Sequence, residues 1–454
     1  MSKFKIYLLI LVSTAFAYWG SLKYGFSQDD YFFLFISRAR SLGEVLQFFS
    51  PWHQQGFPFF RPLGTQLYYF LFNQNPLFMH IFMLLLQSLN GYLVYKLISK
   101  LFKENQLTSI LIGVLYTISS VHFLSLFYIA ATQQLLSATF GLLSLNAFIS
   151  KKYLASALYL IPGILSKESA LVVPGIATLI YLYESSKISL AWIKKYLLAI
   201  LPYIIVISLY LGIRLVAGIS VQSEYQPVFG PSLLSTIRWY LLFGYGAPEA
   251  MLNYGLSGMS IRLGQFATDF GYLGLVSVLT TFIGFIYFVV RVLAVMLKGD
   301  WLSKKKTLIL LTWFILGIIL IVWYPDHRYP HYLDLSLIPL LYIVISHPKG
   351  KLKYFMFGTM VVASLSSILL SEQNHWTTGR ALMAREALTR YDWGNLCKEE
   401  NIVFTGAGTA PRELSYTLSL ENGPRVICNK PGLGVYYQGV DKTWPASATT
   451  VKVE

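Results

Sequence analysis

The sequence predicts an all-α membrane protein that crosses the bilayer about eleven times and carries a small α/β tail at its C-terminus. Hydrophobic residues make up 55% of the 454 residues and charged residues 13%, which is more apolar surface than a single soluble core can bury. Apolar runs of roughly 17 to 25 residues recur along the chain, the length that a helix needs to cross the hydrocarbon layer. Short lysine clusters separate these runs, as the positive-inside rule describes.

The apolar runs account for much of the first 370 residues. They lie at residues 4–22, 76–98, 106–121, 131–149, 153–166, 169–184, 196–216, 271–292, 307–324, 332–346 and 354–370. The first run begins after two lysines and ends in an Ala-Phe-Ala sequence at residues 15–17, which is also the pattern of a cleaved signal peptide. Tyr18 and Trp19 favour a retained span, because they continue the run as an interfacial aromatic anchor does.

Six lysine clusters set the predicted orientation. If the first cluster lies in the cytoplasm, alternating spans place each later cluster there as well. The clusters are Lys3 and Lys5; Lys96, Lys100 and Lys103; Lys151 and Lys152; Lys187, Lys194 and Lys195; Lys298 with Lys304 to Lys306; and Lys349, Lys351 and Lys353. The N-terminus is then cytoplasmic and, with an odd number of spans, the C-terminus is extracytoplasmic. The excess of 15 positive charges follows these clusters, so nucleic acid is not an expected partner.

The expected location is the plasma (inner) membrane of a bacterium, because no eukaryotic targeting signal is recognisable. An endoplasmic reticulum membrane fits the same topology. In either membrane the chain is a multi-pass integral protein.

Two domains are predicted from composition. Residues 1–370 form the membrane module, with long outer loops at residues 23–75 and 217–270. Residues 371–454 are more polar and form the extracytoplasmic tail. Outer loops of this length above a helical bundle are natural walls for a site, so functional residues are expected there.

The tail predicts a small α/β unit. Strands are expected at residues 401–405 and 425–428, and a helix at residues 412–420. The only two cysteines of the chain, Cys397 and Cys428, both lie in this tail. Outside the cytoplasm they form either a disulfide or two buried thiols.

Two adjacent carboxylates, Asp29 and Asp30, follow the first span and precede a predicted helix at residues 32–49. Carboxylates are costly against lipid, so the pair is expected to line a cavity at the membrane surface. Adjacent side chains of a helix point about 100° apart, so one carboxylate is expected to react while its neighbour orients it. The alternatives are a solvated loop carboxylate and an N-cap of the following helix.

Two outer segments supply candidate phosphate ligands. Lys167 and Glu168 interrupt the apolar sequence between two spans, where a lysine can hold a phosphate and the glutamate can fix that lysine or bind a sugar hydroxyl. Arg61 suits bidentate phosphate recognition. The alternatives are an interfacial Lys-Glu pair that reaches the water and a solvated loop arginine.

The loop at residues 323–332 is the third candidate segment. It combines Arg328, another candidate phosphate ligand, with three candidate substrate contacts, His327, Tyr329 and His331. The spacing of the histidines suits a metal pair on a helix, but the proline between them disfavours that helix, so no metal site is expected. An interfacial aromatic belt also explains the tyrosine without a ligand.

Taken in order along the chain, these motifs resemble the GT-C superfamily of membrane glycosyltransferases that use polyprenyl-phosphate sugars, and within it the protein O-mannosyltransferase-like branch. The matching positions are the acidic pair, Phe-Arg-Pro-Leu at residues 60–63, Val-His at 121–122, Ser-Lys-Glu at 166–168 and Arg-Tyr-Pro at 328–330. The resemblance covers about residues 1–346, and only the combination in order is specific.

The resemblance implies an inverting transfer of a sugar from a polyprenyl-phosphate-linked donor to an acceptor at the outer membrane face. It implies that Asp29 is the base and that Asp30 assists. Basic residues over the cavity would hold the donor phosphate, and His122 joins the candidate substrate contacts. The chain contains no Asp-x-Asp sequence, so it departs from metal-dependent oligosaccharyltransferases, and no obligatory metal ion or other cofactor is expected.

The expected partners are the membrane lipid bilayer, the lipid-linked sugar donor and an unidentified protein, lipid or glycan acceptor. A transporter or flippase of lipid-linked glycans is one alternative, but it should place ionisable residues near span midpoints, whereas here they lie at the outer ends. An O-antigen polymerase or ligase is another, and it would rely on arginine-rich loops without requiring the acidic pair.

Overall fold

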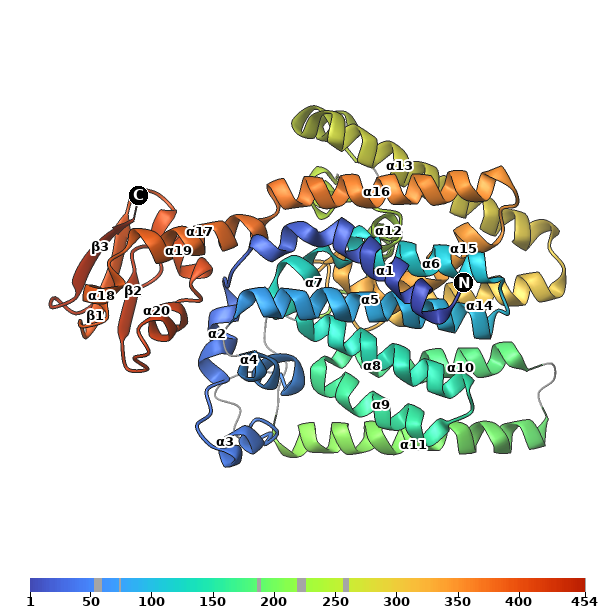
Figure 1. Ribbon diagram of the computed structural model, residues 1–454, viewed down its shortest axis with the longest axis horizontal. Helices are drawn as coiled ribbons and strands as arrows, with labels where there is room; N and C mark the ends of the chain where they lie inside the picture. Colours follow the sequence, from blue (N-terminus) through green and yellow to red (C-terminus); the bar gives the residue numbers. More distant parts are fainter. Residues whose placement is uncertain (53–58, 73–74, 186–188, 219–225, 256–260, 454) are drawn as a thin grey trace.

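A computed structural model of the chain describes residues 1–52, 59–72, 75–185, 189–218, 226–255 and 261–453. Lys187 and parts of the predicted outer loops, namely residues 53–58, 73–74, 219–225 and 256–260, lie outside the described residues. The helices form an elongated bundle, and a small α/β unit near the C-terminus lies beyond one end of it (Figure 1).

A helix overlaps each of the predicted apolar runs. The bundle helices are α1 (Lys3–Tyr18), α5 (Pro76–Leu101), α6 (Gln106–Ile118), α8 (Thr132–Ile149), α9 (Tyr153–Ser166), α10 (Val173–Glu184), α11 (Leu190–Val216), α13 (Leu263–Lys298), α14 (Trp301–Ile318), α15 (Asp334–Ser346) and α16 (Lys351–Asn374). Polar side chains fix where several of them begin. Asn75 accepts the N–H of Phe78 at 3.2 Å at the start of α5, and Asn105 accepts the N–H of Thr108 at 2.9 Å at the start of α6.

Six helical segments of the described chain are long and apolar enough to cross a membrane. They are Lys3–Lys23, Pro76–Leu101, Gln106–Phe127, Leu190–Val216, Leu263–Lys298 and Lys351–Arg390. The predicted number of about eleven spans is not confirmed. Two further apolar helical segments, Tyr153–Ser166 and Pro330–Ser346, are shorter than these six, and α8 includes Gln133, Gln134 and Asn146.

The lysine-bearing helix ends meet at one end of the bundle. Lys100 donates to the Ser150 hydroxyl at 3.2 Å, and Lys353 donates to the Thr108 hydroxyl at 2.9 Å. Figure 1 shows the N-terminus at this end, with α2 and the C-terminal unit at the opposite end. The described lysines of these clusters and the acidic pair therefore lie toward opposite ends of the helical bundle.

Shorter elements complete the bundle. They are η1 (Trp19–Lys23), α2 (Asp29–Ile36), α3 (Leu42–Gln47), η2 (Leu63–Leu67), α4 (Tyr68–Leu71), η3 (Ser120–His122), α7 (Phe123–Phe127), η4 (Ile129–Ala131), η5 (Glu168–Val172), α12 (Ser232–Gly244), η6 (Glu249–Tyr254) and η7 (Pro330–Leu333). The single helix predicted at residues 32–49 is wrong in extent. Two helices, α2 and α3, occupy this range instead. The side chain of Ser41 accepts the N–H of Glu44 at 3.2 Å and so caps a new helix, α3, at this point.

The C-terminal unit follows α16. Its elements are α17 (Trp376–Arg390), α18 (Trp393–Leu396), β1 (Asn401–Gly406), α19 (Ala410–Thr417), α20 (Asn422–Ile427), β2 (Gly434–Tyr437) and β3 (Thr449–Val453). The three strands form a parallel sheet in the order β2-β1-β3. β1 covers the strand predicted at residues 401–405, and α19 overlaps the helix predicted at 412–420. The strand predicted at 425–428 is wrong, because this segment belongs to α20 and its C-cap.

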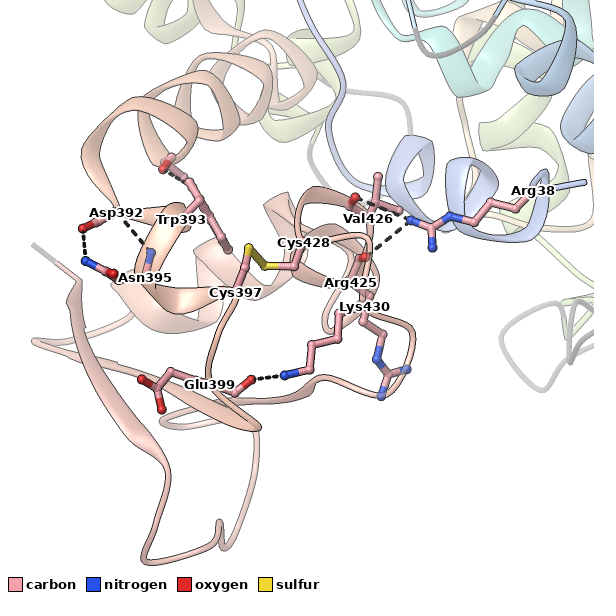
Figure 2. Close-up of a disulfide and its surroundings, with 11 residues drawn as sticks. Arg38, Asp392, Trp393, Asn395, Cys397, Glu399, Arg425, Val426, Cys428 and Lys430 are labelled. Carbon is pink, nitrogen blue, oxygen red and sulfur yellow. Dashed lines mark hydrogen bonds between the residues drawn. A yellow bond between two sulfur atoms is a disulfide. The ribbon is translucent and has the colours of Figure 1, made fainter. Parts of the chain in front are cut away.

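A disulfide joins Cys397, which follows α18, to Cys428, which follows α20 (Figure 2). The bond links the start of the α/β unit to the helix that packs against α2. A buried apolar cluster also continues from the unit into the bundle, with Phe404 and Tyr437 on one side and Phe33 and Tyr69 on the other. The unit is thus packed onto the end of the bundle that carries the acidic pair.

Candidate functional site

The acidic pair occupies the first turn of α2. Gln28, just before it, has a φ of 52° and a ψ of −126°, a backbone conformation that non-glycine residues rarely adopt. Its N–H donates to the carbonyl oxygen of Thr417 in the C-terminal unit at 2.7 Å. This turn sends the two carboxylates into different surroundings.

Asp30 is fully enclosed. One carboxyl oxygen accepts the Tyr69 hydroxyl at 2.5 Å, the other accepts the Ser27 N–H at 2.9 Å, and the Ala130 N–H contributes as well. Burial raises the pKa of Asp30 to about 7, and the hydrogen bonds oppose that rise. An enclosed and fully bonded carboxyl positions its surroundings and does not meet a substrate.

Asp29 differs from its neighbour because its side chain is exposed. Its N–H donates to the Tyr128 hydroxyl at 3.0 Å, and that hydroxyl also bonds the carboxylate. Protein surrounds the exposed carboxyl closely enough that desolvation raises its pKa, while Tyr128 and the charge of Arg380 oppose the rise. An accessible carboxylate with a raised proton affinity suits a general base.

A cavity of about 360 Å³ lies where the Lys167-Glu168 turn meets α11 and α14, within the size range of small-ligand sites. Its lining combines charged side chains with an apolar wall. The lining residues are Phe59, Arg61, Lys167, Glu168, Ser169, Leu171, Arg214, Gly317, Leu320, Ile321, Tyr324, His327 and Tyr332. Three of the predicted phosphate-site residues, Arg61, Lys167 and Glu168, therefore share one cavity.

Glu168 holds two arginines in place at this cavity. Arg61 Nε lies 2.6 Å from one carboxylate oxygen of Glu168, and Arg214 Nη1 lies 3.1 Å from the other. Arg61 Nη1 also donates to the Gln133 side chain at 2.8 Å, and the Phe59 ring lies 4.1 Å from the guanidinium carbon of Arg61. One carboxylate thus orients two cations without neutralising the group of three that line the cavity.

Lys167 is the third cation, and its side chain is buried. Its ammonium lies 4.6 Å from the centre of the Tyr332 ring. Burial lowers the pKa of Lys167 to about 7, and the charge of Arg61 lowers it further, while Glu168 and Asp334 oppose this change. An incoming anion would favour the charged form, so the cavity is suited to a phosphate.

A chain of hydrogen bonds joins the acidic pair to this cavity. The Ala130 N–H reaches the Asp30 carboxylate, and the Ala130 carbonyl accepts Nε2 of Gln133 at 2.8 Å. The oxygen of the same amide accepts Arg61. One side chain of α8 therefore connects the turn that carries the carboxylates to the cations.

The residues predicted at 323–332 separate into two environments. His327 lines the cavity, whereas Arg328 is not among its described lining residues. Arg328 lies near Arg238, and burial lowers the pKa of its guanidinium. Tyr329 stacks on His331 with ring centres 5.8 Å apart, and His331 is buried.

His122 is enclosed and does not line the described cavity. Its Nδ1 lies 3.0 Å from a carboxylate oxygen of Asp334 at the start of α15. The pair joins η3 to α15, so the structure shows a polar contact between these two elements at this residue.

Sequence reasoning missed four residues that shape the site. Gln133, Arg214, Tyr128 and Arg380 all contact or influence the predicted residues. Arg214 had a usable signal, since it is a charge at the outer end of an apolar run. No local sequence pattern distinguished Gln133, Tyr128 or Arg380 from other residues of their types. In the described part of the chain, no three His, Cys, Asp or Glu side chains gather as metal ligands would.

The fold defines a class, a multi-span helical membrane protein with an α/β unit packed on one end. No family model matches the chain, and no curated protein matches it. Two solved cryo-EM structures of arabinofuranosyltransferase AftD from Mycobacteria, one of them a mutant, are similar at 13% and 12% identity with TM-scores of 0.46 and 0.45. Each alignment covers 90% of this chain but only 30% and 31% of the AftD chains, so this chain spans about a third of their length. A likeness at this level assigns no function.

Proposed function

We propose that the chain is a membrane glycosyltransferase of the GT-C type, which transfers a sugar from a polyprenyl-phosphate-linked donor to an acceptor with inversion. The observation that carries the proposal is an accessible carboxylate, Asp29, on a turn that hydrogen bonds through Ala130 and Gln133 connect to a cavity with three cations and an apolar wall. Asp29 itself is not among the described lining residues of that cavity. A sugar on an isoprenoid phosphate needs these parts, a base for its acceptor, cations for its phosphate and an apolar surface for its lipid.

In the proposed reaction Asp29 accepts the proton of the acceptor hydroxyl as that oxygen attacks the anomeric carbon. The bond between this carbon and the donor phosphate breaks, and the phosphate oxygen leaves with the electron pair. Arg61, Lys167 and Arg214 stabilise the charge that develops on the phosphate. Attack from the face opposite the leaving phosphate inverts the anomeric carbon.

The enclosed carboxyl of Asp30 takes a supporting role. Its bonds to Tyr69 and Ser27 fix the first turn of α2, which sets the direction of the Asp29 side chain. Leu171, Leu320 and Ile321 supply the apolar wall on which the isoprenoid would lie.

The orientation and the finer family position belong to the same proposal. By the positive-inside rule the lysine clusters support a cytoplasmic N-terminus, and the acidic pair would then face the outer side of a plasma membrane. The assignment to the protein O-mannosyltransferase-like branch rests on the sequence motifs alone.

The test uses purified chain in detergent with farnesyl phosphate as the probe of the cavity. Farnesyl phosphate should bind, and its affinity should fall in Arg61→Gln and Arg214→Gln but not in Arg390→Gln, an exposed arginine of α17. Farnesyl-phosphate-linked hexoses and pentoses, offered with alkyl glycoside acceptors, should release farnesyl phosphate and form new glycosides.

The outcome that contradicts the proposal is the absence of both binding and transfer with this donor panel. Lipid movement in liposomes that depends on the glycan headgroup, without transfer, would favour the transporter alternative. Transfer only from diphosphate-linked glycans would favour the polymerase or ligase alternative.

A further inference from the structure

The C-terminal unit holds both ends of α2, the helix that carries the acidic pair. At the start of α2 the N–H of Gln28 donates to the carbonyl oxygen of Thr417 at 2.7 Å. Just past its end, Arg38 donates from Nη2 to the carbonyl oxygens of Arg425 and Val426 at 3.4 and 3.5 Å (Figure 2). These carbonyls lie within three residues of Cys428, so the disulfide anchors the same surface.

Arg380 of α17 makes the contact nearest to the carboxylates. Its Nη1 donates to the side-chain oxygen of Gln28 at 2.7 Å. Gln28 is the residue with the unusual backbone conformation, and such a conformation persists only where several contacts determine it. The backbone bond to Thr417 and the side-chain bond to Arg380 are two such contacts, and both come from the C-terminal unit.

The Arg380 side chain is itself fixed on several sides. Its guanidinium carbon lies 5.6 Å from the Trp376 ring centre and 5.2 Å from the Tyr416 ring centre, so the group sits between two aromatic rings. Its Nη2 lies 3.4 Å from a carboxylate oxygen of Glu413. These contacts hold the Arg380 guanidinium in one orientation.

We propose that Arg380 is a positioning residue for Asp29, so that the C-terminal unit forms part of the reaction site. The proposal rests on the proposed role of Asp29 as the base. Arg380 fixes the turn before Asp29 through Gln28, and its positive charge favours the ionised form that a base needs. The unit is therefore more than an appendage that is tethered to the membrane module.

The groups facing Asp29 give the direction of the electrostatic effect. Tyr128 of the segment before η4 bonds it, Asp30 is its neighbour on α2, and Arg380 approaches from α17. Arg380 lowers the pKa of Asp29, against the rise that desolvation by the surrounding protein causes. Loss of the Arg380 charge should therefore raise this pKa, so the base becomes protonated at a higher pH.

The experiment compares Arg380→Gln, Arg380→Lys and the matched control Arg390→Gln, an exposed arginine of the same helix that pairs with Glu386. Aspartate-selective ¹³C labelling in detergent follows the Asp29 carboxyl, which is assigned by its loss in Asp29→Asn. In Arg380→Gln the titration midpoint of Asp29 should rise, and turnover at pH 6 should fall by about tenfold with the folded amount unchanged. Arg380→Lys should keep the midpoint close to the wild type, and Arg390→Gln should change neither quantity.

An unchanged Asp29 midpoint and an unchanged turnover in Arg380→Gln overturn the proposal. If Arg380→Gln does not fold, Gln28→Met tests the same link, because it removes the side-chain oxygen that Arg380 binds and leaves the charge of Arg380 in place. Turnover should then fall with the folded amount unchanged, and an unchanged turnover together with an unchanged Asp29 midpoint overturns the proposal. The positioning role of Arg380 and the role of Asp29 as the base can fail separately. Loss of transfer in Asp29→Asn with no effect of Arg380→Gln refutes the positioning role alone, and full transfer in Asp29→Asn refutes the base that Arg380 is proposed to position.

Discussion

The buried ammonium of Lys167 should make donor binding depend on pH, and Lys167→Met should remove that dependence. The side chain is buried beside Arg61 and the Tyr332 ring, and its pKa is lowered to about 7. A donor phosphate would bind the charged form more tightly. Binding therefore draws a proton onto the lysine when the pH is above this pKa.

The size of the effect follows from that pKa. A lysine with a pKa of about 7 is about 90% charged at pH 6 and about 10% charged at pH 8. Farnesyl methyl phosphate, a diester like the proposed donor whose charge does not change in this range, should therefore bind up to about tenfold more weakly at pH 8 than at pH 6. A hydrogen bond to a charged group contributes about 1.5 to 3 kcal/mol, so Lys167→Met should weaken binding by about 10- to 150-fold at pH 6.

Isothermal titration calorimetry of farnesyl methyl phosphate across pH 6 to 8 measures both quantities. Lys195→Met is the matched control, because this lysine is exposed near the opposite end of α11 from the cavity. Its affinity and its pH dependence should equal those of the wild type. Wild-type affinity in Lys167→Met at pH 6 would refute the assignment of Lys167 as a phosphate ligand.

Three further changes test other parts of the structure. Glu168→Gln removes the carboxylate shared by two arginines, so farnesyl phosphate should bind more tightly while the protein melts at a lower temperature, and Glu386→Gln on the surface should do neither. The buried carboxyl of Asp30 has a higher pKa in the folded chain than the ordinary 3.8, so the melting temperature should fall as the pH rises from about 4 to about 7, and Asp30→Asn should flatten this slope. Replacing Cys397 and Cys428 by serine should destabilise the C-terminal unit by about 2 to 4 kcal/mol, and a reductant should have the same effect on the wild type but none on the variant.

The helices were predictable because apolar runs of membrane length leave few alternatives. The short helices and strands of the C-terminal tail were harder to predict. Val426, Ile427 and Cys428 are an apolar run that is typical of a strand, yet Pro424 just before them is tolerated in the first turn of a helix, where its missing N–H costs nothing. For runs this short, the packing of the whole unit decides between helix and strand.

The candidate site was predictable where the signal was local. Lys167 and Glu168 stood out as charges that interrupt an apolar sequence, and Arg61 as an arginine of a predicted outer loop, and the structure brings all three into one cavity. Arg214 lies 46 positions from Glu168, and Arg380 lies 352 positions from Gln28. Contacts across such separations depend on tertiary packing, so no spacing in the sequence could indicate them.

Sugar transfer by Asp29→Asn is the most direct test of the proposed function. The substitution keeps the shape of the side chain and leaves the backbone N–H bond to the Tyr128 hydroxyl in place, but it removes the base. Turnover of a farnesyl-phosphate sugar should therefore fall by about 100-fold or more with the folded amount unchanged. Asp392→Asn, at an exposed helix cap of the tail, is the matched control and should transfer like the wild type. Wild-type turnover in Asp29→Asn would contradict the proposed mechanism.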